Sequence, residues 1–274
     1  MAKTKKSGKK SGKKSSKKTG IKNNKKITQK KPMEIEFEAK FLDINKDELI
    51  EKMKSLGAKM TQSNTLYKRC MYGLCDVKRG YVRVRDEGDK TTLTAKIYKD
   101  SKFPEEYEVT IKDNFENGKA FLGALNLTEK SYHETMREKW ILNLGKSNIK
   151  NNTNNNECEI AFDSIPGIPL YVEIECKTKQ NLNKAIKLLK LNNAKKCFGS
   201  YGKCFVEYYD MTENDINNLI PKLTFENIYN ELKPYIKKNE DLLKDVSRQH
   251  LAAWQLLEAG FRKSRAQKLA APKL

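Results

Sequence analysis

The 274-residue sequence lacks several features that would assign a location or a catalytic class at once. It has no apolar run near the roughly 18 residues needed to cross a bilayer, and no apolar segment of a secretory signal at its start. It has only two histidines, His133 and His250, and no Cys-x-x-Cys pair. These absences argue against a membrane protein, a secreted disulfide framework and a zinc centre.

Six cysteines are present nevertheless, and their spacing suggests no partners. They are Cys70, Cys75, Cys158, Cys176, Cys197 and Cys204. Without a secretory signal, they are expected to be free thiols in a reducing compartment, cytoplasmic or nuclear. No cysteine nucleophile is needed for the chemistry considered below, and a surface or structural role is expected for His133.

The net charge of +20 is unevenly distributed. Residues 1–32 contain 14 lysines and no acid, and residues 245–274 contain six Lys or Arg against two acids. The body between them is therefore nearly neutral. The basic segment 1–32 has nothing to bury and is expected to be a disordered tail. It can contact nucleic acid or another polyanion through phosphate neutralisation, serve as a nuclear-localisation signal, or only aid solubility.

The rest of the chain divides by its pattern into a strand-rich region, 33–210, and C-terminal helices, 211–244. Residues 245–274 have six Ala but no Asn or Ile, unlike the body. This basic, Ala-rich piece is either an amphipathic helix around residues 251–261 or an appended segment, and we assign it no function from its sequence.

The strand-rich region opens with a strict alternation over Met33–Phe41. Glu34, Glu36, Glu38 and Lys40 fall on one parity, and apolar residues on the other. A period of two indicates a strand with two unlike faces. Seven further strands are expected at 66–71, 80–85, 91–98, 106–112, 135–142, 157–163 and 170–177. Their short connections favour antiparallel pairing. The fold class is thus α+β, with an eight-stranded antiparallel sheet that can close into a barrel or tunnel.

Helices are expected between and after these strands. Asn45 can cap a helix that ends at Gly57, and Phe115–Leu127 forms another. Leu182, Ile186 and Leu189 make a helical stripe. Two more helices are expected to start near Thr212 and Thr224, the second limited by Pro234. The Asn-rich insert 148–156 is expected to be a loop.

The charged parity of the strands can line a wet lumen or face solvent on a sandwich, and alternation alone leaves both open. The sorting of the charges favours the lumen. Glu36/Glu38 and Glu173/Glu175 are paired carboxylates suited to Mg²⁺ or Mn²⁺. Arg83/Arg85, Arg137/Lys139, Lys40 and Lys96 are strand cations that can grip the several negative charges of a triphosphate.

These elements resemble the CYTH superfamily, the triphosphate tunnel metalloenzymes. Glu36-Phe37-Glu38-Ala39-Lys40 fits its E-x-E-x-K signature, Arg83-x-Arg85 its paired-arginine strand, and Lys96 its following lysine. Glu106/Glu108 resemble its central pair of glutamates. Arg137/Lys139 resemble its later basic pair, although the pair reads Arg-x-Lys here. Asp163 and Val172-Glu173-Ile174-Glu175 resemble its closing D…V-E-I-E. The match spans about residues 33–177, with Ser200-Tyr201 at a helical end.

The resemblance implies an eight-stranded antiparallel tunnel that binds triphosphates with a divalent metal. Glu36, Glu38 and Glu175 would hold metal, and Glu173 and Asp163 a second ion or the attacking water. Lys40, Arg83, Arg85, Lys96, Arg137 and Lys139 would grip the phosphates, with Glu106 and Glu108 beside them.

Three functions fit these features. The first is a metal-dependent triphosphatase acting on tripolyphosphate, thiamine triphosphate or a nucleotide, and therefore a hydrolase of phosphoanhydride bonds. The second is a class IV-like adenylyl cyclase, which would need a base-recognition pocket that the sequence does not reveal. The third is an RNA 5′-triphosphatase or polyphosphate-binding module, which the tail 1–32 would serve.

Overall fold

The computed structural model describes residues 1, 37–74, 80–97, 105–145, 156–197, 201–212 and 214–270. By backbone contacts the chain divides into two units, Met1–Pro32 and Met33–Leu274. Every strand and helix that the structure describes belongs to the second unit.

Ten strands of that unit form one sheet. They are β1 (Phe37–Leu42), β2 (Lys59–Gly73), β3 (Gly80–Asp86), β4 (Thr91–Ile97), β5 (Glu105–Ile111), β6 (Glu129–Asn143), β7 (Glu157–Ile165), β8 (Ile168–Cys176), β9 (Lys195–Cys197) and β10 (Lys222–Leu223). Eight of them, β1 to β8, correspond to the strands expected from the alternation, and they pair antiparallel.

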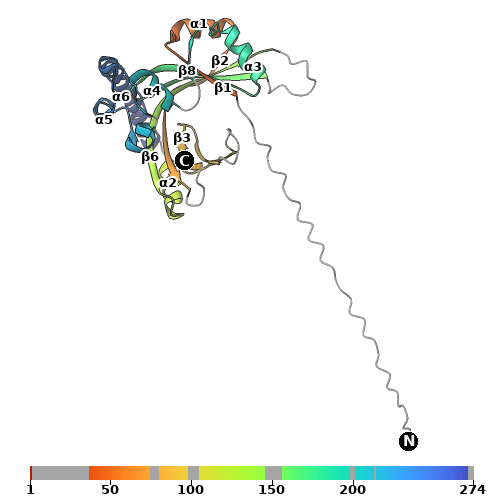
Figure 1. Cartoon of the computed structure of the whole chain (residues 1–274), viewed down its shortest axis with the longest axis vertical. Helices are drawn as coiled ribbons and strands as arrows, with labels where there is room; N and C mark the ends of the chain where they lie inside the picture. Colours follow the sequence, from red (N-terminus) through yellow and green to blue (C-terminus); the bar gives the residue numbers. More distant parts are fainter. Residues whose placement is uncertain are drawn as a thin grey trace. The chain divides into compact units, whose positions relative to one another are not determined.

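The strand order is β5-β4-β3-β2-β6-β7-β8-β1-β9, and the short β10 joins β6 in parallel. Among the described strands, β5 and β9 end this order and no pairing joins them, so the sheet is not shown closed into a barrel. The two long central strands, β2 and β6, bend along their length (Figure 1). Three register shifts lie in β2, and such irregularities bend a strand.

Helices connect and follow the strands. They are α1 (Lys46–Ser55), α2 (Phe115–Ala124), α3 (Lys179–Leu188), α4 (Gly202–Tyr209), α5 (Ile228–Leu232) and α6 (Glu240–Ala270), with a π-helical turn at Asp215–Leu219. The expected cap of α1 is confirmed, because the Asn45 side chain accepts from the backbone N–H groups of Asp47 and Glu48. Gly57 follows this helix at φ +80°, a conformation that favours glycine.

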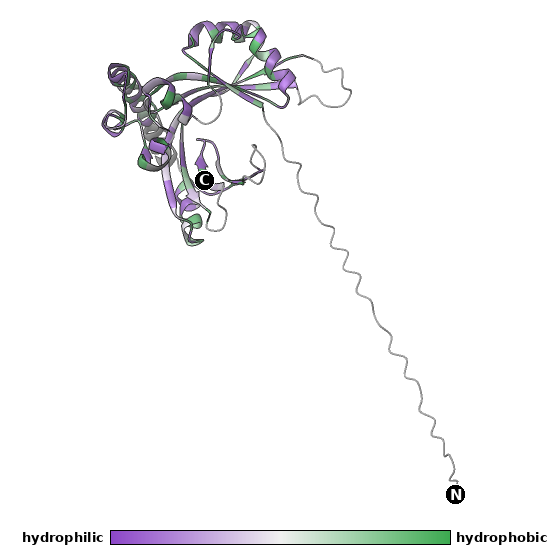
Figure 2. Cartoon of the chain, viewed as in Figure 1, coloured by the Kyte–Doolittle hydropathy of each residue, from purple (hydrophilic) through white to green (hydrophobic). Residues whose placement is uncertain are grey.

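The apolar parity of the strands packs under the helices. Beneath α1 and α3, a core cluster joins Phe41, Ile160, Phe162, Val172 and Ile174 to helix residues such as Met53 and Ala185. Both helices lie over the β1 and β8 part of the sheet (Figure 1). They mix hydrophobic and hydrophilic residues along their length (Figure 2), as helices with one buried face do.

Three smaller clusters complete the interior. Helix α2 covers Val84 and Tyr72 with Phe115 and Leu122. Helices α4 and α5 pack with the start of β8 and the start of α6 in a second large cluster. Trp254 and Leu257 of α6 pack against a cluster formed by Leu66, Met136 and Phe225.

The change of composition at residue 245 does not coincide with a structural boundary. Helix α6 starts at Glu240 and continues through it to Ala270, and residues 251–261 are helical as one of the two expectations had it. No helix in the described part of the chain is long and apolar enough to cross a membrane.

The expectation of six free thiols is wrong for two of them. Cys158 of β7 and Cys176 of β8 form a disulfide, and their Cα atoms lie 4.5 Å apart. The antiparallel register places these two residues directly opposite each other, at the short spacing of a non-hydrogen-bonded pair. The two cysteines are far apart in the sequence, and the β7–β8 hairpin brings them together, so their spacing along the chain does not reveal the pair. Cys70, Cys197 and Cys204 are free and buried, and Cys75 lies outside the described residues.

Candidate functional site

The strand register gathers the predicted site residues on one face of the sheet. Residues directly opposite each other in an antiparallel pair point to the same side. Glu108 opposes Thr94, Thr94 opposes Arg83, and the pairing continues through β2 and β6 to β1. Twelve predicted residues share this face, which is the one opposite α1, α2 and α3: Glu38, Lys40, Arg83, Arg85, Lys96, Glu106, Glu108, Arg137, Lys139, Asp163, Glu173 and Glu175.

One half of this face, on β1, β8, β7 and β6, is centred on Glu173. The Lys40 ammonium lies 2.9 Å from Glu38 and 2.9 Å from Glu173. Burial lowers the pKa of Lys40, but Glu173 and Glu38 outweigh it and raise that pKa above its ordinary value. Burial likewise opposes ionisation of Glu173, yet Arg137 and Lys40 hold its pKa well below the usual range. Glu173 is therefore a carboxylate held between two cations.

Arg137 also binds Asp163 through both carboxylate oxygens, its Nε donating to Oδ1 at 2.6 Å and its Nη2 to Oδ2 at 2.5 Å. The same Nη2 donates to Glu173 at 2.8 Å. Asp163 is only 1% exposed. Both of its oxygens are thus engaged by Arg137, and in this structure Asp163 orients the arginine.

Glu38 and Glu175 lie directly opposite each other on β1 and β8, and Glu159 opposes Glu175 on β7. Like charges placed directly opposite destabilise a sheet unless cations lie among them. In this structure Lys40 pairs with Glu38 and Lys139 pairs with Glu159. Burial and the neighbouring Glu173 raise the pKa of Glu38, although Lys40 opposes this shift. The donor set is oxygen only, as Mg²⁺ and Mn²⁺ prefer.

These carboxylates alone do not complete a metal centre. Within the described ranges, no three Asp, Glu, His or Cys residues are grouped closely enough to hold an ion. Glu36, the first residue of the signature and a predicted ligand, lies outside those ranges, as does Glu34.

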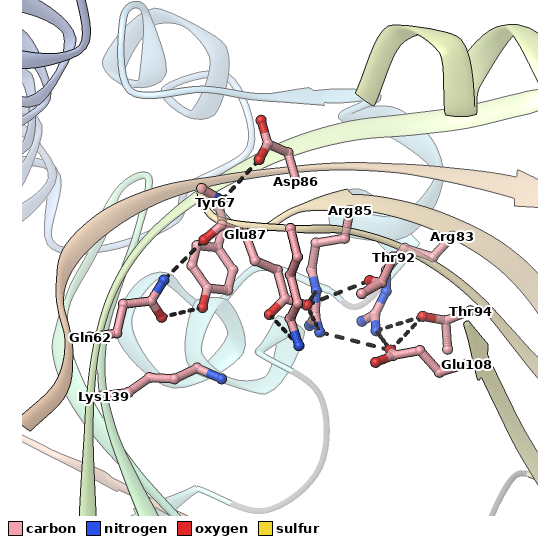
Figure 3. Close-up of polar contacts among 12 residues, drawn as sticks. Gln62, Tyr67, Arg83, Arg85, Asp86, Glu87, Thr92, Thr94, Glu108 and Lys139 are labelled. Atoms are coloured by element: carbon pink, nitrogen blue, oxygen red, sulfur yellow. Dashed lines mark hydrogen bonds and ion pairs between the residues drawn. The ribbon is translucent and has the colours of Figure 1, made fainter. Parts of the chain in front are cut away.

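The other half of the face, on β3, β4 and β5, is rich in arginine (Figure 3). Arg83 donates to Thr94 at 3.2 Å and lies 3.6 Å from Glu108, which accepts from Thr94 at 2.8 Å. Arg85 lies 3.9 Å from the same Glu108. Lys96 pairs with Glu106 at 2.8 Å. The predicted basic residues and the central pair of glutamates are therefore brought together.

Glu87 is a member of this half that the sequence did not identify. It is 2% exposed and accepts from the Arg85 Nε at 2.7 Å. Burial raises its pKa, but Arg85, Lys90 and Lys139 outweigh burial and lower it. In Figure 3 Lys139 points toward Glu87 from β6. Glu87 follows Arg83 and Arg85 with the same parity, and that signal could have placed it on the face.

Lys139 connects the two halves. Its ammonium lies 3.1 Å from Glu159 on β7 and contributes to the lowered pKa of Glu87 beyond β3. On β2, which lies between β6 and β3, the Tyr67 hydroxyl donates to the Gln62 side chain at 2.5 Å. The Gln62 side chain in turn donates to the Glu87 backbone carbonyl at 2.9 Å.

Two further residues of the face, Arg69 and His133, also escaped the sequence patterns. Arg69 of β2 lies opposite Arg85 of β3 and His133 of β6. The Arg69 guanidinium stacks on the Tyr201 ring at 4.6 Å, and the Tyr201 hydroxyl lies 2.5 Å from the His133 Nδ1. Burial and Arg69 lower the pKa of His133 to about 3, so this histidine is neutral. It is buried, and the expected alternative of a surface position is therefore wrong.

Comparison with known proteins gives matches to solved structures only. No family model matches the chain, and no curated protein does. A conserved hypothetical protein from Pyrococcus furiosus is 18% identical, covering 59% of this chain and 95% of its own, with a TM-score of 0.43. A "putative adenylate cyclase" from Vibrio parahaemolyticus is 12% identical, covering 63% and 98%, with a TM-score of 0.47. HpAC1 from Hippeastrum, described as a "putative adenylyl cyclase" with a dominant triphosphatase activity, is 14% identical, covering 61% and 91%, with a TM-score of 0.39.

Proposed function

We propose that this chain is a metal-dependent triphosphatase that hydrolyses an inorganic or organic triphosphate. One observation carries the proposal: cations and carboxylates from eight neighbouring strands share one face of the sheet, and the apolar parity is buried under helices on the other. In this proposal the sheet wraps around the bound triphosphate as the tunnel that the resemblance implies.

The arginine-rich half is the proposed phosphate grip. A triphosphate carries about four negative charges, and guanidinium groups match its oxygens with paired donors. Arg83, Arg85 and Lys96 come from adjacent strands and point to one side, where Glu106 and Glu108 now pair with them. Phosphate oxygens would exchange with these carboxylates, so the ion pairs keep the cations in position before substrate arrives.

The carboxylate-rich half is the proposed metal side. Glu36, Glu38 and Glu175 would hold Mg²⁺ or Mn²⁺, with Glu173 beside them. A divalent ion supplies charge neutralisation at phosphate oxygens. Lys40 and Arg137 hold Glu173 ionised between them, so this carboxylate can accept a hydrogen bond from a water aligned for in-line attack. Asp163 keeps Arg137 in place.

The proposal is tested with the purified full chain and Mg²⁺ or Mn²⁺. Tripolyphosphate, thiamine triphosphate, ATP and triphosphate-ended RNA are offered, and phosphate, pyrophosphate and cyclic AMP are followed. We expect phosphate release that needs the metal. Each of Glu38→Gln and Arg85→Ala should lower the rate about 100-fold, the cost of removing one transition-state contact.

A matched control is Glu51→Gln on α1. Glu51 is an exposed glutamate that pairs with Lys54 at 3.0 Å, away from the sheet face, and its loss should leave the rate unchanged. Activity that survives both Glu38→Gln and Arg85→Ala would refute the site. Cyclic AMP as the main product from ATP would favour the cyclase instead.

A further inference from the structure

We infer that Arg69, which lies outside the family signature, is a phosphate-binding residue of this face. It is also the residue that an incoming phosphate chain contacts first. The inference rests on the proposed function and extends it by one named residue and its ligand class, the phosphate chain of a triphosphate.

The predicted cations of the arginine-rich half are already matched by carboxylates. Arg85 pairs with the buried Glu87, Arg83 with Glu108 and Glu106, and Lys96 with Glu106. Three cations therefore face three carboxylates. A phosphate that binds any of them must displace an acidic side chain.

Arg69 is the exception in this half. Its Nε and Nη2 atoms are buried and have no hydrogen-bond acceptor. No ion pair joins the guanidinium to a described carboxylate, and it interacts instead with the neutral Tyr201 side chain. A buried guanidinium without an acidic partner is costly, because the desolvated charge has lost its water and gained no opposite charge. It lies opposite Arg85, and two like charges in that position repel.

One donor of the neighbouring Arg83 also lacks a hydrogen-bond acceptor, and this arginine is affected by the nearby positive charges. The Nε of Arg83 is also buried without an acceptor. Burial, then Arg85 and Arg69, lower the pKa of Arg83 to about 10. The Tyr201 ring supports the Arg69 guanidinium from one side and the neutral His133 borders it, and neither supplies a negative charge. An anion bridging Arg69 to Arg83 and Arg85 would satisfy these donors together.

The chemistry that fits is a tetrahedral phosphate oxyanion, which can accept from several guanidinium donors at once. Arg69 would bind the first phosphoryl group without displacing a carboxylate. Arg83 and Arg85 would then release Glu108 to the solvent side as the phosphate chain settles.

The test is isothermal calorimetry and thermal unfolding of the full chain with inorganic tripolyphosphate and, separately, ATP. The variants are Arg69→Gln and Arg69→Lys. Lys68→Gln is the control, because Lys68 is the adjacent basic residue of β2 on the other face and pairs with Glu258 of α6 at 3.7 Å.

We expect Arg69→Gln to weaken tripolyphosphate binding at least tenfold, Arg69→Lys to restore only part of it, and Lys68→Gln to leave it within twofold. Without ligand, Arg69→Gln should unfold at an equal or higher temperature, since it removes an unmatched charge. A purely structural arginine would lower that temperature instead. Loss of affinity for both ligands, or for tripolyphosphate alone, supports the inference.

Unchanged tripolyphosphate affinity in a folded Arg69→Gln variant would overturn the role of Arg69 and leave the proposed function standing. Failure of the unaltered chain to bind either ligand would overturn both. The two failures are therefore distinguishable.

Discussion

At the scale of single residues, the charged face is a set of ion pairs whose burial differs from pair to pair. Asp163 is almost fully buried and both of its oxygens depend on Arg137, whereas the Glu159 side chain is 31% exposed beside Lys139. A buried charge that loses its partner costs several kcal/mol, while an exposed pair contributes little. Arg137 and Lys139, both on β6, therefore contribute differently to the stability of the fold.

We therefore expect Arg137→Met to lower the free energy of unfolding by about 3–5 kcal/mol, because it leaves the Asp163 carboxylate unpaired. Lys139→Met, two residues away on the same face, should cost about 1 kcal/mol or less. Urea unfolding of the two variants measures the difference. Equal costs would show that the Arg137–Asp163 pair is not held as described.

His133 predicts a pH dependence of stability. Its pKa is about 3 in the folded chain, against about 6.5 when unfolded, so the unfolded chain takes up the proton first as pH falls. Stability is therefore full above pH 6.5 and declines below it. Between pH 7 and 5.5 this one group should remove about 1 kcal/mol. Burial also lowers the pKa of His250, to about 4, so that group contributes a similar loss. Urea unfolding at both pH values should therefore show a loss about 1 kcal/mol smaller in His133→Gln than in the unaltered chain; an equal pH response in both would contradict the burial of a neutral His133.

At the scale of elements, the long helix α6 is the least expected feature. Its sequence differs in composition from the body, yet its Trp254 and Leu257 pack against residues of β2 and β6. These strands carry Tyr67, Arg69, Arg137 and Lys139 on their opposite face. Helix α6 therefore supports the part of the sheet that joins the two halves of the site.

Leu257→Ala should lower the free energy of unfolding by about 1–2 kcal/mol, because it removes a partly buried side chain from this packing. The adjacent Leu256 is 76% exposed, and Leu256→Ala should change stability by no more than about 0.5 kcal/mol. Chemical unfolding of the two single variants compares them directly. If both leave stability unchanged, α6 does not pack on the sheet.

At the scale of the whole molecule, most of the net charge lies in the unit Met1–Pro32, whereas the helices and strands of the described residues all lie in Met33–Leu274. Residues 33–244, which carry the charged face, are nearly neutral, as suits a face of matched ion pairs. Phosphate neutralisation by the lysines of 1–32 does not depend on base sequence, so the nucleic-acid contact they make should depend on salt and little on sequence.

Deleting residues 1–32 should leave the unfolding temperature unchanged and weaken binding to a single-stranded RNA. The slope of log affinity against log salt should fall with it, because fewer phosphates are neutralised. Fluorescence anisotropy between about 50 and 200 mM salt measures both. A full-length variant with the 14 lysines changed to glutamine is the control for length, and it should behave like the deletion. RNA affinity retained by both would locate binding elsewhere.

Local patterns were sufficient for much of this structure. The period of two predicted the strands and the shared face of every predicted site residue that the structure describes. The cap at Asn45 and the glycine at position 57 predicted where α1 begins and ends. These properties depend on a residue and its near neighbours along the chain. They follow from backbone geometry and need no partner from another strand.

Register and burial, in contrast, were decided only in three dimensions. Which residue lies opposite which depends on hairpin lengths and bulges, so the sequence could not foresee the Cys158–Cys176 bond or Arg69 beside Arg85. Nor could it show that Glu87 is buried against Arg85 while Arg69 has no acid to match it. A charge's solvation and its partners are properties of non-local packing, and they determine which cation remains available for a phosphate.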